Sequence, residues 1–478
     1  MKHYAFPVFA WLLAVSLYAA TTLGGGVVNA QSVARTLPAA KSNGSGGGGN
    51  GGGAQDPGPR GAPVSAGGFL PGLTSEQLEQ AQDGANRFVE TETFHGGLGP
   101  SYNSGPFKAC GECHAQPAVG GSSPSLAAYP FVGANPQATV DYNADGATNT
   151  VPSFITPSGP VREARFLTFA DGTPDGGVHD LFTVTGRADA PSCHLAQPPF
   201  AAQLAAGNIV FRIPTPVFGA GLIENIDDTT ILANQSANAA AAAALGIVGQ
   251  PNRSGNDGTI TRFGWKAQNK SLLMFAGEAY VVEDGVSNEL FPTKRPAPGA
   301  TLPSGCKISA TPDDTSNPQL TGPAVNSDIT AFAAFMRMLA PPAKGPSTPQ
   351  TQQGQQLFTT IGCSLCHTPS MMTAESSEAK ALSNVQANLF SDLLIHNMGT
   401  GLADGISQGR ANGQQFRTAP LWGLGQRVFF LHDGRTSDLV EAIQQHSSSG
   451  SEANGVIKNF NGLSQSQQQD LLDFLRTL

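Results

Sequence analysis

Two short motifs limit what this chain can fold into more than any other feature. Cys110–His114 and Cys363–His367 both have the pattern Cys-x-x-Cys-His. Two thiols three residues apart on a helical turn face the same way, so both can add to the two vinyl groups of one haem. The histidine that follows can then bind the iron. A single motif could instead be a redox dithiol or half of a zinc site, but two in one chain favour two covalently bound haems c. The predicted haem-binding residues are Cys110, Cys113, His114, Cys363, Cys366 and His367.

Two cysteines remain outside these motifs, Cys193 and Cys306. An even pair in an oxidising compartment predicts a disulfide. Cys193-His194 looks like the end of a third haem motif, but the first cysteine of the pattern is missing, so no third haem is expected.

The first thirty residues have the pattern of an export signal. A short polar start at Lys2-His3 is followed by an apolar run over 5–23 and by small residues at Val28–Ala30. This predicts a signal peptide over 1–30, cleaved before Gln31. A membrane anchor is the alternative, but the run is interrupted and ends in small residues. The mature protein is therefore expected to be periplasmic or otherwise exported, with no membrane span.

Charge and composition favour a soluble enzyme or electron carrier. The formal charge of −9 is spread along the chain without a basic stripe, which argues against nucleic acid as a partner. Only 13% of residues are charged, whereas there are 58 glycines and 35 prolines. Long loop-rich segments around short helices are the expected result.

The order of segments along the chain predicts two haem domains. Glycine-rich 31–70 has too few bulky apolar residues to form a core and is predicted to be a flexible tether. Residues 71–340 are predicted to be an N-terminal haem domain with loop-rich and short-strand insertions. A proline-rich linker over 341–347 precedes a helical cytochrome c domain over 348–478. The expected fold class is mainly α, with two cytochrome c-like haem domains.

Helix caps support this division. Thr74 with Gln77, and Ser464 with Gln467, have the spacing of capping boxes at helix starts. Thr348 followed by proline is a further helix start. The alanine run 239–244 also predicts a helix, because alanine is the strongest helix former.

Several stretches, taken in order with both haem motifs, resemble the bacterial di-haem oxidoreductases grouped as peroxidases or thiol oxidoreductases. That family is related to the di-haem cytochrome c peroxidases and to the di-haem enzyme that matures tryptophan tryptophylquinone. The resemblance runs from about residue 75 to 478. It is carried by Gly97–Pro100, Phe211–Gly219, Gly221–Glu224, Arg262–Ala267, Phe416–Leu424 and Phe430–Arg435.

The resemblance implies a sixth ligand for the C-terminal haem. In related enzymes this ligand is a Met or a Tyr on the helix after a His-Asp-Gly-like turn, and the matching position here is His446. Bis-histidine ligation by His367 and His446 would give a lower potential than His/Met ligation. Met398 is the competing ligand. His396 and His432 are expected to hold hydrogen bonds near the haem or the domain interface.

The same resemblance implies the catalytic residues of the N-terminal haem. The tryptophan between the haems corresponds to Trp265, and the catalytic acid falls close to Glu283. Phe275 stands where the family has Gln, and Glu278 and Asp284 are neighbouring alternatives for the acid. A carboxylate among apolar residues would have a raised pKa suited to proton transfer.

No distal partner is matched to this haem in the sequence, and His95 and His194 are the histidines that remain as candidates.

The function expected from these features is reduction of hydrogen peroxide, or a similar small oxidant, at the N-terminal haem. Electrons would come from a small redox protein through the C-terminal haem. A non-enzymatic di-haem electron carrier and an oxidase of a protein or thiol substrate are the alternatives. The related peroxidases also hold calcium between their domains, but the Thr-Ala-Pro expected before the His-Asp-Gly turn is replaced by 428–431, so the sequence does not support that site.

Overall fold

The computed structural model describes most of the chain after residue 52. The predicted signal peptide, and the tether as far as residue 52, lie outside the described residues. In the described part, no helix combines the length and apolar character needed to cross a bilayer. The described residues are 53–61, 66–106, 108–123, 135–141, 146–296, 298–307, 309 and 311–478.

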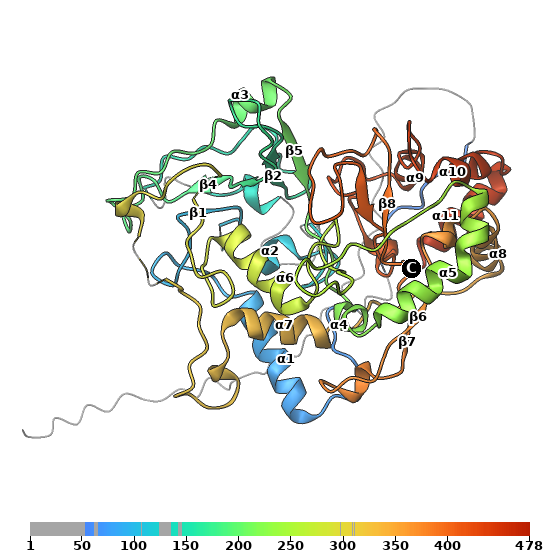
Figure 1. Cartoon of the computed structure of the whole chain (residues 1–478), viewed down its shortest axis with the longest axis horizontal. Coiled ribbons are helices and arrows are strands. Elements are labelled where there is room, and N and C mark those ends of the chain that lie inside the picture. Colours follow the sequence, from blue (N-terminus) through green and yellow to red (C-terminus); the bar gives the residue numbers. More distant parts are fainter. Residues whose placement is uncertain are drawn as a thin grey trace, which may run out of the picture. The chain divides into compact units, whose positions relative to one another are not determined.

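Helices predominate in this part of the chain, as the sequence predicts, and they are joined by long loops (Figure 1). A π-helical turn, Tyr280–Asp284, continues α6, and a 3-10 turn covers Cys363–Leu365. The α-helices are α1 (Ser75–Phe88), α2 (Cys110–Cys113), α3 (Phe200–Ala205), α4 (Ala220–Glu224), α5 (Asp228–Ala244), α6 (Leu272–Ala279), α7 (Asp328–Met338), α8 (Pro349–Thr360), α9 (Leu439–Gln444), α10 (Asn454–Asn461) and α11 (Gln465–Leu475).

The strands are short and form small antiparallel sheets. β1 pairs with β4, β2 lies between β3 and β5, β6 pairs with β7, and β8 pairs with β9. Their bounds are β1 (Ser101–Tyr102), β2 (Glu163–Phe166), β3 (Val178–His179), β4 (Phe182–Thr183), β5 (Ile209–Arg212), β6 (Met371–Met372), β7 (Gln386–Ala387), β8 (Ile395–Asn397) and β9 (Gln415–Arg417).

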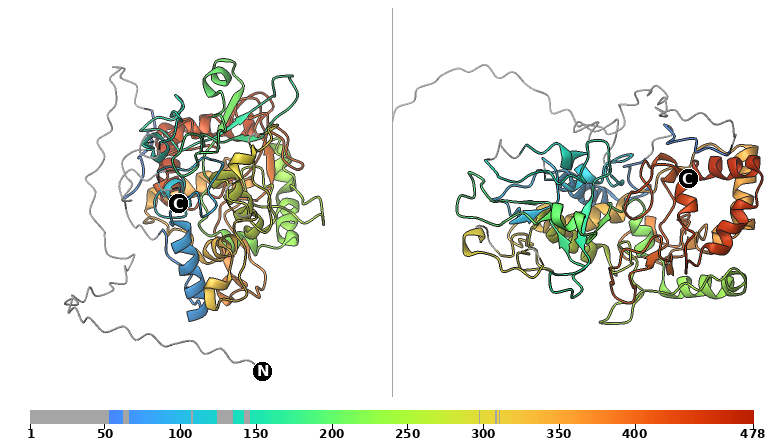
Figure 2. Two further views of the ribbon diagram at one scale, coloured as in Figure 1. Left: turned by 90° about the vertical axis from the view of Figure 1, so that its left-hand side faces the viewer. Right: turned by 90° about the horizontal axis from the view of Figure 1, so that it is seen from above.

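Two helix pairs flank the segments that carry the haem motifs. α1 packs along α7, and α8 packs along α11, as Figures 1 and 2 show. Each pair approaches closely at a glycine: a Cβ would lie 2.1 Å from the Ala331 carbonyl oxygen at Gly84, and 1.9 Å from the Asp470 carbonyl oxygen at Gly354. Glycine inside a helix costs stability, but here any side chain would force the paired helices apart.

The predicted caps are confirmed. Thr74 with Gln77, and Ser464 with Gln467, form reciprocal capping boxes at α1 and α11, and Thr348 caps α8. On α1, Phe88 is buried against the phenylalanines of α7, at ring-centroid distances of 5.9 Å for Phe332 and 5.0 Å for Phe335. Burial of each such side chain contributes roughly 1.5–3 kcal/mol.

The apolar cores do not follow the segment order along the chain. The cluster around α1, α6 and α7 also takes in Met371, Leu389 and Trp422, which follow the predicted linker over 341–347. The alanine-rich α5 is helical as predicted, and its end packs against the second haem motif through Ala242. The two-domain boundaries therefore stay a prediction.

The predicted disulfide between Cys193 and Cys306 is present. It joins two loops that are 113 residues apart in sequence and lies in a core with the strands β1, β2 and β4. This cross-link closes the loop-rich region between the two haem motifs.

Residues 53–61 are held in place, although composition predicts a flexible tether over the whole of 31–70. The Asp56 carboxylate accepts hydrogen bonds from the Arg476 guanidinium at 2.5 and 2.7 Å, and from the Leu439 backbone N–H at 2.8 Å. The Arg60 backbone N–H donates to the Gly425 carbonyl at 2.7 Å. One buried ion pair thus anchors a stretch whose glycine-rich neighbourhood gives no sign of order.

A buried tyrosine joins the end of α6 to the start of α7 and to the loop after α1. The Tyr280 hydroxyl lies 2.7 Å from a Glu92 carboxyl oxygen and 3.3 Å from a carboxyl oxygen of Asp328. The tyrosine has one hydroxyl proton for two carboxyl groups, so a proton on Glu92 completes the arrangement. Burial raises the pKa of Glu92 to about 8, and the charges of Asp284 and Asp328 act in the same direction.

Replacing Glu92 by Gln is expected to remove a pH-dependent loss of stability. The folded-state pKa of about 8 lies above the ordinary value of 4.5, so folding favours the neutral carboxyl. The free energy of unfolding should therefore fall as the pH rises from about 4.5 to 8, by up to about 1.4 kcal/mol per pH unit. Chemical denaturation from pH 5 to 9 should give a flatter profile for Glu92→Gln. The exposed Glu90→Gln is the control and should keep the parent slope; an unchanged slope in Glu92→Gln would contradict the assignment.

Candidate active site

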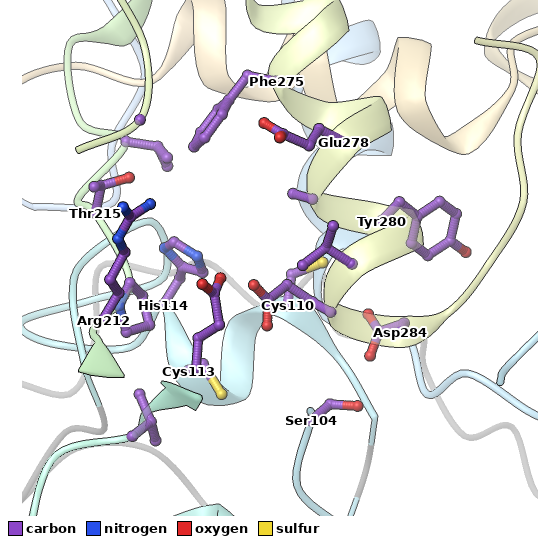
Figure 3. A pocket seen from close by; sticks show the side chains of 18 of the residues that line it. Ser104, Cys110, Cys113, His114, Arg212, Thr215, Phe275, Glu278, Tyr280 and Asp284 are labelled. Carbon is purple, nitrogen blue, oxygen red and sulfur yellow. The ribbon is translucent and has the colours of Figure 1, made fainter. Parts of the chain in front are cut away.

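The short helix α2 brings the first haem motif to the wall of a cavity (Figure 3). Cys110, Cys113 and His114 all line this cavity. The His114 backbone N–H donates to the Cys110 carbonyl at 3.0 Å, which continues the turn and keeps both thiols on one side. His114 Nδ1 donates to the Gly121 carbonyl at 3.1 Å. That bond defines the tautomer and leaves Nε2 as the nitrogen without a proton.

Burial lowers the pKa of His114 to about 4, although the backbone carbonyls of Gly121 and Thr215 act in the opposite direction and raise it. The imidazole is therefore neutral at physiological pH, which is the form that binds metal. Burial also raises the pKa of both thiols, Cys110 and Cys113, well above the usual range. Apolar side chains such as Val217 and Met336 complete this part of the wall.

The opposite wall is formed by α6 and its π-helical continuation (Figure 3). A π-turn is a wider turn than an α-turn, and such turns are frequent at functional sites. Here the predicted acid Glu283 and its neighbour Asp284 both line the cavity. Burial raises the pKa of Glu283 well above its usual range, and the charges of Glu163 and Asp284 raise it further.

The three candidate acids differ in how they are held. Glu278 accepts hydrogen bonds from the side-chain amides of Asn269 and Gln268. Burial raises the pKa of Asp284 to about 7. Within the residues that the structure describes, no side-chain hydrogen bond holds Glu283. An acid that hands a proton to a substrate needs a free carboxyl group, and Glu283 fits this requirement better than Glu278.

The second motif lines a separate cavity, which adjoins α9 and α10. Cys363, Cys366 and His367 border it, and His446 borders the same cavity. His367 Nδ1 donates to the Phe390 carbonyl at 3.0 Å, so Nε2 is again the nitrogen without a proton. Burial lowers the pKa of His367 to about 4, and a positive charge on His446 would lower it further.

His446 lies just after α9, in the turn that follows the helix. Its Nδ1 donates to the Ala442 carbonyl at 2.7 Å, and burial lowers its pKa. His446 thus has the same arrangement as the two motif histidines: one ring nitrogen is bonded to a backbone carbonyl and the other carries no proton. His367 and His446 line the same cavity, as bis-histidine binding of one iron would require.

The other candidate ligands are held differently. Met398 also lines the second cavity, so it stays an alternative to His446. His396 is bonded on both ring nitrogens, to Glu452 and Asp392 at 2.9 Å each. Although burial opposes a charge on it, the Asp392 carboxylate and the neighbouring Cys366 raise the pKa of His396 well above its usual range. His396 has no free nitrogen for a metal.

Three further histidines lie at or away from these cavities. His432 stacks on Phe416, with 4.3 Å between ring centroids, and borders the second cavity. His95 and His194, the candidates for the distal side of the first haem, are both exposed and do not line the first cavity.

Trp265 lines both cavities. Its indole N–H donates to the Ile213 carbonyl at 2.8 Å, and only 8% of the residue is exposed. The next residue, Lys266, is fully buried, 3.0 Å from the Asp404 carboxylate, which also lies 2.6 Å from the Arg212 guanidinium. This ion-pair network holds the Trp265 segment between β5 and the 404–417 loop.

The residues of both cavities fit a haem bound through thioether links. Each cavity has two free thiols, one imidazole whose Nε2 carries no proton and mostly apolar walls. In the described part of the chain, no three His, Cys, Asp or Glu side chains are grouped to hold a metal ion by themselves. A haem iron does not need such a group, because the porphyrin supplies four of its ligands.

Sequence reasoning did not single out several charged residues at these cavities. Glu163 on β2 lines the first cavity and forms an ion pair with Arg165. Arg417 and Arg427 line the second. The only sequence signal was the resemblance stretch that contains Arg417, because a buried charge looks the same in sequence as an exposed one.

Comparison with solved structures finds only distant similarity. Hydrazine synthase from Kuenenia stuttgartiensis is 19% identical over 34% of this chain and 59% of its own, with a TM-score of 0.22. A MauG-like protein associated with microbial copper homeostasis is 21% identical over 34% and 55%, with a TM-score of 0.24. The dihaem peroxidase BthA from Burkholderia thailandensis is 16% identical over 45% and 65%, with a TM-score of 0.28. The match thus covers less than two thirds of each of these three chains.

No curated protein matches the sequence. A match to a protein family does exist, and it covers more than half of the chain. It extends over residues 161–478, which include the second haem motif, Trp265 and Glu283. The chain belongs to the family described as di-haem oxidoreductase, putative peroxidase.

Proposed function

We propose that this protein is an exported di-haem c oxidoreductase that reduces hydrogen peroxide. Cys110 with Cys113, and Cys363 with Cys366, would each bind one haem covalently, and the histidine that follows each pair would bind its iron. The observation that carries the proposal is the difference between the two cavities. Both have a haem motif and share Trp265, but only the first is lined by Glu283, a half-buried carboxyl that no hydrogen bond holds among the described residues.

Proton transfer is the part of the reaction that the chain's own residues perform in the first cavity. When bound, the haems supply the iron at which the oxygen–oxygen bond is split and a store of electrons. Glu283 would accept a proton from one peroxide oxygen and return it to the departing oxygen. Its raised pKa suits this role, because a carboxyl that is less acidic than usual holds a proton more readily and can pass it on to the substrate.

The second cavity is proposed to be a closed electron entry site. His446 would complete the ligand set with His367, so that no position stays open for peroxide. Trp265 lines both cavities and its indole would assist electron exchange between them. A small redox protein is the proposed donor. The cleavable signal expected over 1–30 and the disulfide between Cys193 and Cys306 support an oxidising, extracytoplasmic location.

Glu283→Gln is expected to lower peroxide turnover by a factor of roughly 10²–10⁴, because the amide cannot exchange a proton. Steady-state peroxide reduction by the purified two-haem protein measures this effect. Glu278→Gln is the matched control: it lines the same cavity but is tied to Asn269, so its turnover should stay within about tenfold of the parent. Loss of turnover in the Glu278 variant alone would transfer the role to that residue.

His446→Ala is expected to convert the C-terminal haem from a six-coordinate, low-spin species to a five-coordinate, high-spin one, because the sixth ligand is lost. Optical and EPR spectra of the ferric protein would record the change. Met398→Leu serves as its counterpart and should leave the spectra unchanged. A spectral change in the Met398 variant only would identify Met398 as the ligand. Two low-spin haems and no response to peroxide in the parent would instead favour an electron carrier.

A further inference from the structure

Two arginines at the second cavity are buried, and neither has a carboxylate partner among the described residues. Arg417 is 9% exposed and Arg427 is 8% exposed. The Arg417 Nε donates to the Gly264 carbonyl at 3.1 Å, whereas the Nε and one terminal nitrogen of Arg427 have no acceptor in the described part of the chain. Other buried arginines differ in this respect: Arg212 is paired with Asp404, and Arg476 with Asp56.

An isolated cation in the protein interior is costly, so a counter-charge is expected beside it. Burial lowers the pKa of both Arg417 and Arg427, to about 10, which still leaves each guanidinium charged at neutral pH. The two side chains therefore place two positive charges at one cavity. The chemistry they would recognise is a pair of carboxylates or a similar anion, because a guanidinium donates two parallel hydrogen bonds to such groups.

The two arginines lie beside Trp265. Both border the second cavity and also a smaller one that includes Trp265. The Arg417 backbone N–H donates to the Trp265 carbonyl at 2.9 Å, and the Arg427 guanidinium lies 5.9 Å from the centre of the indole ring.

The thiols of the second motif have different neighbours. Cys363 and Cys366 pack against Ala242, Ile247 and Val456. Neither cysteine borders the smaller cavity that the arginines share with Trp265. The cysteines and the arginines thus border the second cavity together, but only the arginines also border the smaller cavity beside Trp265.

A haem has its vinyl groups and its two propionates on different edges. When the vinyl edge is fixed by the two cysteines, the propionate edge must point elsewhere in the cavity. We propose that Arg417 and Arg427 bind the propionates of the haem held at Cys363–His367, and so orient its propionate edge toward Trp265. This inference rests on the proposed haem attachment in the second cavity but not on peroxide reduction.

The arrangement has a consequence for the reduction potential. A positive charge near the iron disfavours the ferric state, and an ion-paired propionate stays ionised without adding an uncompensated negative charge. Removal of one arginine should therefore favour the ferric form. It should also raise the pKa of the propionate, so that the potential begins to depend on pH.

The test uses the full two-haem protein and the variants Arg417→Gln and Arg427→Gln. Haem staining of denaturing gels first establishes that both haems are attached; a parent without the second haem would refute the proposed function rather than the arginine assignment. Spectroelectrochemical titration from pH 5 to 9 then gives the potential of the C-terminal haem. We expect each variant to shift the reduction equilibrium at least about tenfold toward the ferric form, equal to about 59 mV, with a new pH dependence.

The matched control is Arg435→Gln, which removes the same charge from a side chain that is paired with Asp433 and does not border the cavity. Its potential should equal that of the parent. Repeating the titrations with and without inorganic phosphate shows whether the arginines bind a dissolved anion or the haem carboxylates. A potential that responds to phosphate in the parent would overturn the proposal, as would unchanged potentials and pH profiles in both Gln variants.

Arg417→Lys and Arg427→Lys keep the positive charge, so they test the proposal even if the Gln variants fail to fold. They should retain both haems and stay within about tenfold of the parent reduction equilibrium, equal to about 59 mV. The propionate bending bands in resonance Raman spectra should nevertheless shift, because an ammonium group cannot form the bidentate bond. Unchanged propionate bands in both Lys variants would show that the arginines serve only the packing of the protein, and would overturn the proposal.

Discussion

The buried ion pairs of Asp404 connect the walls of both cavities. Arg212, which lines the first cavity, and Lys266, whose ammonium lies 3.9 Å from the centre of the Phe416 ring at the second, share this one carboxylate. Removing one partner from such a buried network leaves an uncompensated charge, which typically costs about 3–5 kcal/mol. The position of Trp265, next to Lys266, depends on this network.

The two cavities have the same haem motif but different titratable groups. The first is lined by four carboxyl groups, among them Glu283 and Asp284, whose pKa values burial raises, and by three arginines. The second is lined by imidazoles, by the guanidiniums of Arg417 and Arg427, and by one carboxyl group, Glu452. The two motifs therefore lie in chemically different surroundings.

Sequence reasoning was most successful where residue type alone carries the signal. The capping box at Thr74 follows from residue type and short spacing, and the cystine between Cys193 and Cys306 was predicted because these two cysteines lie outside the haem motifs, although they are 113 residues apart. It was less successful with contacts between distant segments. The anchoring of Asp56 by Arg476 and the packing of α5 against the second motif connect residues far apart in the chain. The local sequence around these residues does not predict such contacts. Asp56 and Arg476 are of residue types that are usually exposed, and the alanine run of α5 predicts a helix but not what it packs against.

The sequence by itself determined which reactive groups are available: two pairs of thiols with the spacing of haem motifs, the histidines proposed as iron ligands, and a small set of candidate acids. Only the tertiary structure decided which of these groups are free to react. Glu278 is tied by amide donors while Glu283 is not, and His396 is bonded on both nitrogens while His446 keeps one free. The physical reason is that hydrogen bonding and burial set the reactivity of a side chain, and both arise from neighbours that the fold brings from elsewhere in the chain.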